Sequence, residues 1–318
     1  MTQYQFVGVD VAKDKFDVAL CLNNKYYLYT FNNDKKGHQL FIKWLKKYTQ
    51  IAWVCMEATG HYSELIADFL IQHKIRVSVV NPLQIKNFAR ARLSRNKTDE
   101  LDAKLIADYC KMMQPREFVA RSESQKTLKD LTNLLDILKA QHTQLSNQLH
   151  SAQSQNARKV IRKILKELEK EIIRIEKQLA DLVKSNQSLE EKMALITSIK
   201  GVGKLTAYKV LSHVPDVSCF ANAKQFAAYI GISPRQHQSG KYQGKTTISR
   251  LGDRRLRKAF YMAALVSKHH NEYLQPFVSR LQQKGKAPKS IICAVMRKLA
   301  HLIFGVLKSK QPFNVEFC

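Results

Sequence analysis

Apolar and polar positions along the first part of the chain follow the pattern of a mixed α/β domain. Apolar runs at Tyr4–Val11, Phe16–Leu22 and Lys25–Phe31 predict three strands. The last two are joined by Asn23-Asn24, residues that tolerate the positive φ of a tight hairpin turn. The pattern then alternates between helix and strand, over Gly37–Tyr48, Ile51–Met56, Ser63–His73 and Ile75–Val80. We therefore expect a mixed sheet with helices against it.

The Asn81-Pro82 pair closes the last of these strands. Asp99–Met113 then predicts a helix whose apolar residues lie on one side. The first domain is expected to end near Arg116, giving a domain over residues 1–116.

Residues 125–184 contain neither Gly nor Pro, and leucine and isoleucine recur there in steps of three and four. The stripe runs from Leu128 to Leu149, pauses at Ser151–Lys159 and resumes from Ile161 to Leu182. Two such seams predict either a helical hairpin or an intermolecular coiled coil, as a middle domain over 117–188. His142, at a seam position, is interpreted as a polar residue that fixes the register.

A third domain, residues 189–318, is expected to be mainly helical. It opens with a helix, an apolar-Gly-apolar-Gly turn at Gly201 and Gly203, and a second helix through Val214. In such a helix-hairpin-helix the glycines let backbone N–H groups approach a DNA phosphate, and Lys200 and Lys204 flank the turn. The alternative is a tight turn between helices. Further elements are expected at Phe226–Ser233, in a polar basic loop at Pro234–Lys245 and in a helix at Arg254–His269. A final apolar helix, Ser290–Leu307, is expected to lie in the core.

Composition narrows the class of partner. The chain has 53 Lys and Arg against 26 Asp and Glu, a net charge of +27, which favours a polyanionic partner and above all nucleic acid. We find no apolar run of the roughly 18 residues that a membrane-spanning helix needs, and none that resembles a signal peptide. The six cysteines are scattered, without zinc-site spacing, as in a protein of the reducing cytoplasm.

Four carboxylates form the first candidate site. Asp10 ends the first strand, Glu57 follows a later one, and Asp99 and Asp102 lie three apart on one helix with Thr98 as its N-cap. A set of oxygen donors without His or Cys fits Mg²⁺ or Mn²⁺, which assist phosphodiester transfer. Singly, each acid can be a turn, a helix-entry or a first-turn residue, and Asp10 can contact a nucleotide phosphate in an ATPase. We interpret four neighbouring acids as solvated: Asp14, Asp17, Glu64 and Asp108.

These blocks resemble a known family. The order strand–Asp, strand–Glu, helix–Asp-x-x-Asp looks like the RuvC version of the RNase H fold. The motifs Gly8–Lys13, Glu57–Gly60 and Lys97–Ala103 are similar to those of the DEDD-type insertion-sequence transposases, which include Piv-type DNA invertases and bridge recombinases. The similarity covers essentially the whole chain. The resemblance implies a homodimer or homotetramer joined through the coiled coil, and a guide (bridge) RNA that pairs with donor and target DNA.

A serine in the basic loop is the second candidate. From chemistry alone Ser239-Gly240 is most often a turn, although His237, Arg235 and Lys241 are within loop reach. The resemblance implies that Ser239, rather than Ser233 or Ser249, attacks the scissile phosphate and becomes joined to DNA. It also assigns phosphate binding to the basic helix start at Arg254, Arg255 and Arg257, whose alternative role is a solvated basic face.

The sequence therefore predicts a DNA recombinase. The resemblance implies that the carboxylates of one subunit can complete the serine site of another. Two alternatives stay open: a RuvC-like metal-dependent junction nuclease without serine chemistry, and a non-catalytic nucleic-acid scaffold. An ATPase is disfavoured because the Asp10 segment lacks a Gly-rich phosphate loop.

Overall fold

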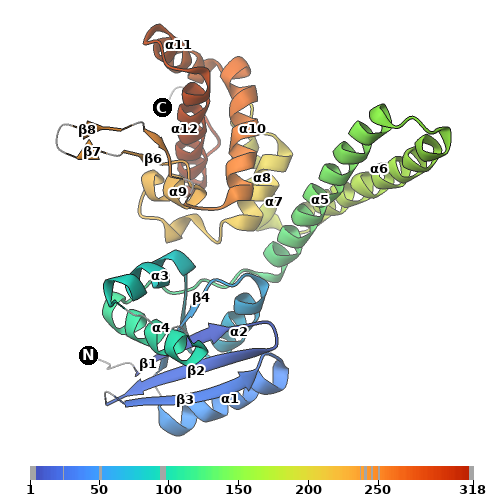
Figure 1. Ribbon diagram of the computed structural model, residues 1–318. Coiled ribbons are helices and arrows are strands. Elements are labelled where there is room, and N and C mark those ends of the chain that lie inside the picture. Colours follow the sequence, from blue (N-terminus) through green and yellow to red (C-terminus); the bar gives the residue numbers. More distant parts are fainter. Residues whose placement is uncertain are drawn as a thin grey trace. The chain divides into compact units, whose positions relative to one another are not determined.

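The computed structural model describes residues 5–23, 25–49, 52–93, 98–236, 238–239, 242–244, 246–249 and 251–314. The chain forms two compact units, Met1–Ala120 and Arg121–Cys318, and each is described by itself. Figure 1 shows the elements of both units.

The first unit is built on a five-stranded mixed sheet of order β3-β2-β1-β4-β5. Strand β1 is antiparallel to β2, which is antiparallel to β3, whereas β4 and β5 run parallel to β1. Asn23 has a φ of 50°, as the hairpin prediction requires. The mixed sheet is thus confirmed, with the strands β1 (Gln5–Val11), β2 (Lys15–Leu22), β3 (Lys25–Asn32), β4 (Ala52–Glu57) and β5 (Arg76–Val80).

Helices cover both faces of this sheet. Helices α1 (Lys35–Tyr48) and α2 (His61–Gln72) pack on one face, over a core of alternate strand residues such as Val7, Val9 and Phe16. Helices α3 (Pro82–Ala91) and α4 (Asp99–Met113) cover the other face, with Ile85 and Ile106 in a second core. Successive strand residues point to opposite faces, so the odd and even residues of β1 face different helix layers.

Helix caps explain where these helices begin. Thr98 accepts a hydrogen bond from the Leu101 N–H, which confirms it as the N-cap of α4. Helix α3 was not expected, because Asn81-Pro82 was interpreted only as a strand terminator. Asn81 caps α3 by accepting from the Leu83 N–H, and Pro82 occupies the first turn, where a missing N–H is harmless.

Two long helices form an antiparallel hairpin at the start of the second unit. They are α5 (Glu123–Ser151) and α6 (Gln155–Lys184), joined by Ala152–Ser154. A 2.7 Å ion pair joins Lys139 to Glu176, and the predicted register residue His142 lies within hydrogen-bond distance of Glu169, at 3.2 Å. The chain therefore adopts the helical-hairpin alternative, and contact between protomers through this hairpin stays a prediction.

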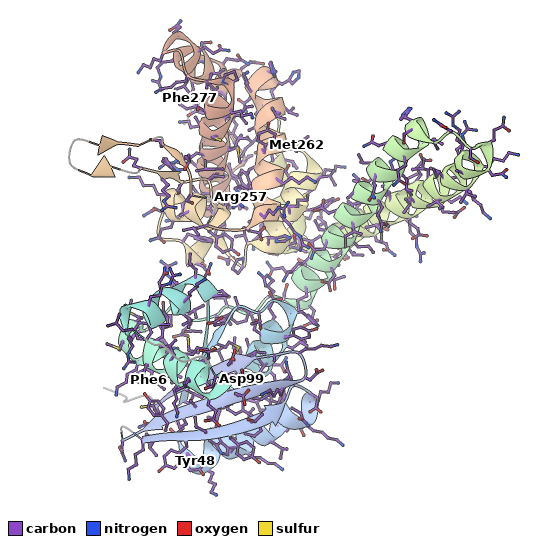
Figure 2. All side chains as sticks on the ribbon, viewed as in Figure 1. Phe6, Tyr48, Asp99, Arg257, Met262 and Phe277 are labelled. Atoms are coloured by element: carbon purple, nitrogen blue, oxygen red, sulfur yellow. The ribbon has the colours of Figure 1, made fainter. Side chains whose placement is uncertain are left out.

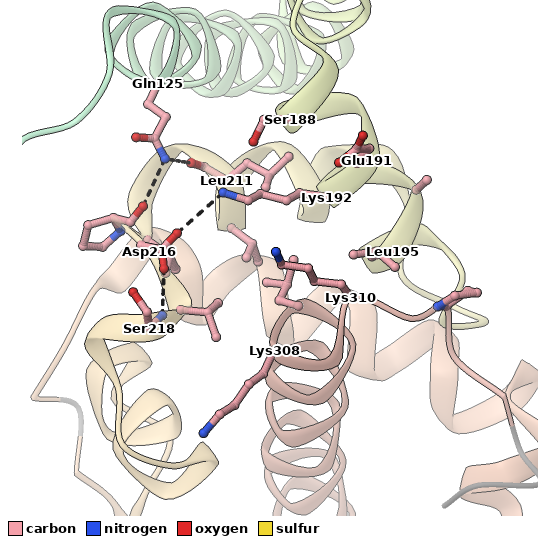
Figure 3. Close-up of a pocket in the computed structure, with 17 residues that line it drawn as sticks. Gln125, Ser188, Glu191, Lys192, Leu195, Leu211, Asp216, Ser218, Lys308 and Lys310 are labelled. Atoms are coloured by element: carbon pink, nitrogen blue, oxygen red, sulfur yellow. Dashed lines mark hydrogen bonds and ion pairs between the residues drawn. The ribbon is translucent and has the colours of Figure 1, made fainter.

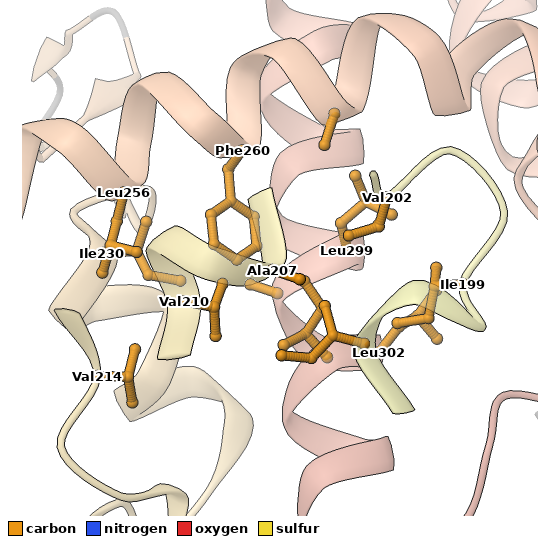
Figure 4. Packing of buried hydrophobic residues seen from close by; sticks show 14 of the residues in the cluster. Ile199, Val202, Ala207, Val210, Val214, Ile230, Leu256, Phe260, Leu299 and Leu302 are labelled. Atoms are coloured by element: carbon orange, nitrogen blue, oxygen red, sulfur yellow. The ribbon is translucent and has the colours of Figure 1, made fainter. Parts of the chain in front are cut away.

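The rest of the second unit is a helical domain. Its core joins residues far apart in sequence, among them Val202, Phe260 and Leu299 (Figure 4). Leu128 and Leu179 of the hairpin are buried in the same core, so the base of the hairpin belongs to this packing, and a separate middle domain stays a prediction. The domain contains α7 (Gln187–Thr197), α8 (Lys204–His213), η1 (Val217–Cys219), α9 (Ala223–Ile230), α10 (Arg254–His270), η2 (Glu272–Leu274), α11 (Gln275–Gln283) and α12 (Pro288–Ser309).

Helix α12 corrects one expectation from the sequence. It has 22 residues, and an 18-residue window within it has a mean hydropathy of 1.7, so within the described residues one helix has the length and apolar character to cross a membrane. The sequence analysis predicted this helix but did not count it as a possible membrane span, because Arg297 and Lys298 interrupt the apolar run. Its apolar residues pack in the core of the second unit, where Val295, Leu299 and Ile303 are fully buried, as the prediction of a core helix requires.

The basic loop contains short antiparallel strands instead of irregular chain. Strand β6 (Pro234–Arg235) pairs with β9 (Thr247–Ile248), and β7 (Gln238–Ser239) pairs with β8 (Tyr242–Gln243). We call the segment from Pro234 to Ile248 the serine ribbon.

One close packing contact in the first unit can be tested by adding a single carbon. A Cβ on Gly8 would lie 2.0 Å from the Ala103 carbonyl oxygen and 2.4 Å from the Ala107 nitrogen. We expect Gly8→Ala to lower the free energy of unfolding of this unit by about 2–3 kcal/mol, because α4 must move away from β1. Thermal and denaturant unfolding measure this.

Gly305→Ala is the matched control. Gly305 lies within α12, and an added Cβ would meet no atom within 4 Å. This substitution should stabilise the second unit by about 0.5–1 kcal/mol. Equal effects of the two substitutions would contradict the packing argument.

Candidate functional site

Asp10 and Glu57 lie on neighbouring strands at the same level of the sheet. Asp10 is in β1 and Glu57 ends β4, one position beyond the register pair Val9–Met56. Adjacent strands are about 4.8 Å apart, and residues at matching register point to the same face. Both side chains are half-buried. The sheet thus places the first two predicted acids side by side on one face.

That face is the one covered by α4. Gly8 contacts the backbone of α4 at Ala103, and Asp10, two residues further along β1, points to the same side. On α4, Asp102 precedes Ile106 by one turn, so both lie on the side of the helix that contacts the sheet.

A lysine locates the beginning of α4 relative to Asp10. The Nζ of Lys15 lies 2.9 Å from Asp99 Oδ2 and 3.1 Å from Asp17 Oδ2. Asp17, in β2, is the direct register partner of Asp10. Asp99, labelled in Figure 2, therefore lies at the end of the sheet that carries Asp10, so all four predicted acids gather at one end of one face.

The chemistry of this acid cluster fits a hard divalent cation. Its donors are carboxylate oxygens. The Lys15 ammonium lies beside Asp99 and Asp17, and its pKa is raised by hydrogen bonds to these two acids. Among the residues that the structure describes, no three His, Cys, Asp or Glu side chains form a metal site as they stand. The acids are thus gathered but are not arranged as a coordination sphere.

Two acids interpreted as solvated are engaged in this region. Asp17 is 7% exposed and accepts a hydrogen bond from Thr30 Oγ1, and Asp108 accepts from Tyr26 and Arg92. The interpretation was wrong for both. The available signal was a carboxylate at an alternate position of an otherwise apolar strand, which the β1–β2 register places opposite Asp10.

The predicted helix-hairpin-helix is present, and its two glycines have different environments. Gly201 has a φ of 94°, and a Cβ there would lie 2.2 Å from Ser267 Oγ of α10. Gly203 is the N-cap residue of α8 and is exposed, and a Cβ there would meet nothing within 4 Å. Gly201 thus serves packing, whereas Gly203 leaves the N-terminus of α8 accessible. Lys204 is exposed beside it, and Lys200 pairs with Glu272 at 2.6 Å.

The serine ribbon carries the second candidate set. The backbone of Ser239 lies in β7, paired with Tyr242, and Arg235 is exposed in β6. His237 and Lys241 lie outside the described residues. The roles predicted for these residues stay predictions.

The basic start of α10 contains residues with two kinds of role. Arg254 and Arg255 are exposed in the first turn. Arg257, labelled in Figure 2, instead donates through Nη1 to the carbonyl oxygens of Ile230 and Gly252, each at 3.3 Å. Its guanidinium therefore joins the two chain segments that lead into and out of the serine ribbon.

Asp253 secures the same helix start. Its Oδ1 accepts from the Arg255 and Leu256 N–H groups, and its Oδ2 lies 2.7 Å from His213 Nδ1. Burial alone would raise the pKa of Asp253, but the His213 hydrogen bond and charge and the two backbone donors lower it to about 2. The carboxylate therefore stays ionised and caps α10.

A cavity of about 840 Å³ lies elsewhere in the second unit, between the start of α5, α7, η1 and the end of α12 (Figure 3). Acids and lysines both line it, with Lys192 3.6 Å from Asp216. Gln125 spans it by donating to the Leu211 and Pro215 carbonyl oxygens. These hydrogen bonds connect the hairpin to the helical domain. None of the predicted site residues lines this cavity.

The contrast between the two glycines gives a prediction for the helix-hairpin-helix. Gly203 has a φ of −86°, which alanine can adopt, so we expect Gly203→Ala to lower stability by less than about 1 kcal/mol. We also expect DNA affinity to fall about tenfold, because the new methyl group blocks the approach of a phosphate. Gly201→Ala should instead destabilise the unit by about 2–3 kcal/mol. Duplex binding by anisotropy, beside thermal unfolding, measures both. Unchanged affinity in Gly203→Ala would leave only the tight-turn alternative.

Comparison with known proteins agrees with these motifs. A DEDD-type IS110 family model described as a transposase matches residues 7–156, and a model of the IS116/IS110/IS902 transposase family matches residues 193–279. The chain is 31% identical over 319 residues to the pilin gene-inverting proteins of Moraxella bovis and Moraxella lacunata, covering 97% of each chain. It is also 25% identical over 285 residues to the IS1111A transposase of Coxiella burnetii, covering 81% of this chain and 76% of that one. The chain therefore belongs to the DEDD-type IS110 transposase family, and it is a DNA transposase or recombinase.

Proposed function

We propose that this recombinase cuts and rejoins DNA strands by transesterification, with Ser239 as nucleophile and Asp10, Glu57, Asp99 and Asp102 as ligands of Mg²⁺ or Mn²⁺. The observation that carries the proposal is the gathering of these acids at one end of one sheet face. The sheet order β3-β2-β1-β4-β5 supports a RuvC-like, RNase H type of domain.

These four acids would hold the proposed cation through their carboxylate oxygens. When bound, it would stabilise the charge that develops on the phosphate and on the leaving oxygen. Like-charged carboxylates at this spacing repel one another, and Lys15 offsets that repulsion through its contacts with Asp99 and Asp17. Lys15 therefore reduces the repulsion between the start of α4 and β2.

Ser239 performs the covalent step. Its Oγ loses a proton and forms a bond to the scissile phosphorus, while the bond from phosphorus to the 3′ oxygen breaks and that oxygen takes up a proton. The DNA 5′ phosphate is then an ester of Ser239. Attack by the 3′ hydroxyl of another strand reverses the step, restores the serine and joins the strands, so no external energy source is needed.

Basic residues hold the DNA around this chemistry. We propose phosphate contacts for Arg235, Lys241, Arg254 and Arg255, and for the helix-hairpin-helix through Lys200, Gly203 and Lys204. Arg257 would act indirectly, since its guanidinium holds the base of the serine ribbon. The net charge of +27 fits this role.

Strand exchange by serine variants tests the proposal. Ser239→Ala should abolish both strand exchange and the covalent protein–DNA adduct, a loss of at least about a thousandfold, because the nucleophile is removed. Asp102→Asn should lose both as well. Ser233→Ala and Ser249→Ala, which change serines at the base of the same ribbon, are matched controls and should stay within a fewfold of the unmodified protein.

The contrary outcomes separate the alternatives. Full strand exchange by Ser239→Ala would favour a RuvC-like nuclease acting with water. Retained exchange by Asp102→Asn with Mg²⁺ present would favour a protein that needs no metal.

We also propose that the protein acts in the cytoplasm as a homodimer or homotetramer and binds a guide RNA from its element. A discrete RNA species should co-purify when the protein is expressed with its flanking element DNA, and sequencing identifies it. Expression without that DNA is the control. If the same RNA mixture is recovered in both cases, the guide is ruled out while the serine chemistry is unaffected.

A further inference from the structure

A second groove of the helical unit lies outside every site considered so far. It has a volume of about 810 Å³ and runs between the base of the serine ribbon, helix α11 and helix α12. The ribbon contributes Pro234, Thr247 and Ile248, and α11 contributes Phe277, which is labelled in Figure 2. None of the residues predicted to bind nucleic acid lines it.

The groove is strongly cationic. Lys286, Lys289, Arg297 and Lys298 line it, and none of its lining residues is Asp or Glu. Lys289 and Arg297 are eight residues apart on α12, and positions four apart lie on the same side of a helix, so these two charges mark a cationic stripe about 12 Å long. Cations gathered without acids repel one another and fit a polyanion.

His301, at the inner end of this stripe, reports the same field. Burial lowers its pKa, and the charges of Arg297, Lys298 and Lys224 lower it further. Its Nε2 is buried with no hydrogen-bond partner among the described residues. The charges around the inner end of the groove are thus positive.

Apolar side chains also line the groove, with Ile232, Ile248, Phe277 and Leu281 facing the same space as the cations. A duplex presents phosphates but keeps the faces of its bases stacked, so these faces cannot contact an apolar lining. An unpaired strand exposes both, and single-strand binding sites combine a basic groove with apolar and aromatic contacts to bases. The lining therefore favours a single strand.

We propose that this groove binds the unpaired DNA strand that leads to or from the scissile phosphate. The choice of DNA rests on the proposed function, because the ribbon that carries Ser239 begins and ends at the groove. A strand joined to Ser239 starts within the length of the ribbon from this groove, so the cationic stripe is in reach of its phosphates.

Binding by the full-length protein tests the groove. Anisotropy is measured with a 20-nucleotide oligothymidine, a 20-nucleotide oligouridine and a 20-base-pair duplex. The variant Lys286→Glu/Lys289→Glu changes two exposed lysines of the groove. The control Lys163→Glu/Lys177→Glu changes two exposed lysines of α6 and gives the same net charge.

The groove variant should bind oligothymidine at least tenfold more weakly than the control does. The slope of log affinity against log salt concentration should be shallower by about 1.4 than that of the unmodified protein, since each of the two lost phosphate contacts contributes about 0.7. Duplex affinity should match that of the control. Phe277→Leu keeps an apolar side chain but removes base stacking, so it should weaken oligothymidine binding about fivefold and leave the duplex unaffected.

Equal losses in the groove and control variants would overturn the proposal, as would equal losses for oligothymidine and duplex. A loss confined to oligouridine would assign the groove to RNA and overturn the choice of DNA. Circular dichroism and thermal unfolding check that each variant folds. Because binding is read without strand exchange, failure of the serine chemistry would leave these results unchanged.

Discussion

The candidate site of the first unit depends on one steric constraint, the absence of a side chain at Gly8. Without a Cβ there, the backbone of α4 lies directly on β1, at a separation that alanine could not adopt. Two residues along the strand stands Asp10, and one turn before the contact on the helix stands Asp99. The distance between strand acid and helix acid is therefore set by backbone packing, which is stiffer than any side-chain interaction.

Electrostatics works against that packing. Carboxylates gathered at the end of a sheet repel, and Asp17 adds another negative charge directly opposite Asp10. The structure answers with Lys15 and with the Thr30 hydroxyl, each bound to Asp17. The second unit has the opposite arrangement, since the groove beside the ribbon contains cations without acids. Part of the negative charge of the acid cluster is thus neutralised within the chain by Lys15, whereas no acid among the described residues lines the basic groove to neutralise its cations.

Elements with strong local signals were predicted closely, and others were not. Helix α4 was placed at its observed bounds because Thr98 caps it and its apolar stripe is regular. Helix α3 was missed because Asn81-Pro82 ends one element and begins the next. The strands of the serine ribbon have two residues each, too short for a period to show. The interpretation of Asp17 as solvated was wrong because its environment comes from pairing across β1 and β2. The family motifs were readable from sequence, whereas the groove was not, since its residues come from α11, α12 and both ends of the ribbon.

The bond network of Arg257 sets a limit on how far the serine can travel. The guanidinium fastens the carbonyl groups of Ile230 and Gly252, and β6 pairs with β9, so both ends of the ribbon are anchored to the helical domain. Ser239 is four residues beyond Arg235, and an extended chain spans at most about 3.5 Å per residue, which confines it within about 14 Å of that anchor. In the proposed mechanism, a nucleophile on so short a tether reaches only a phosphate within that distance. The DNA, and every group that acts on the same phosphorus atom, would then have to enter that small sphere.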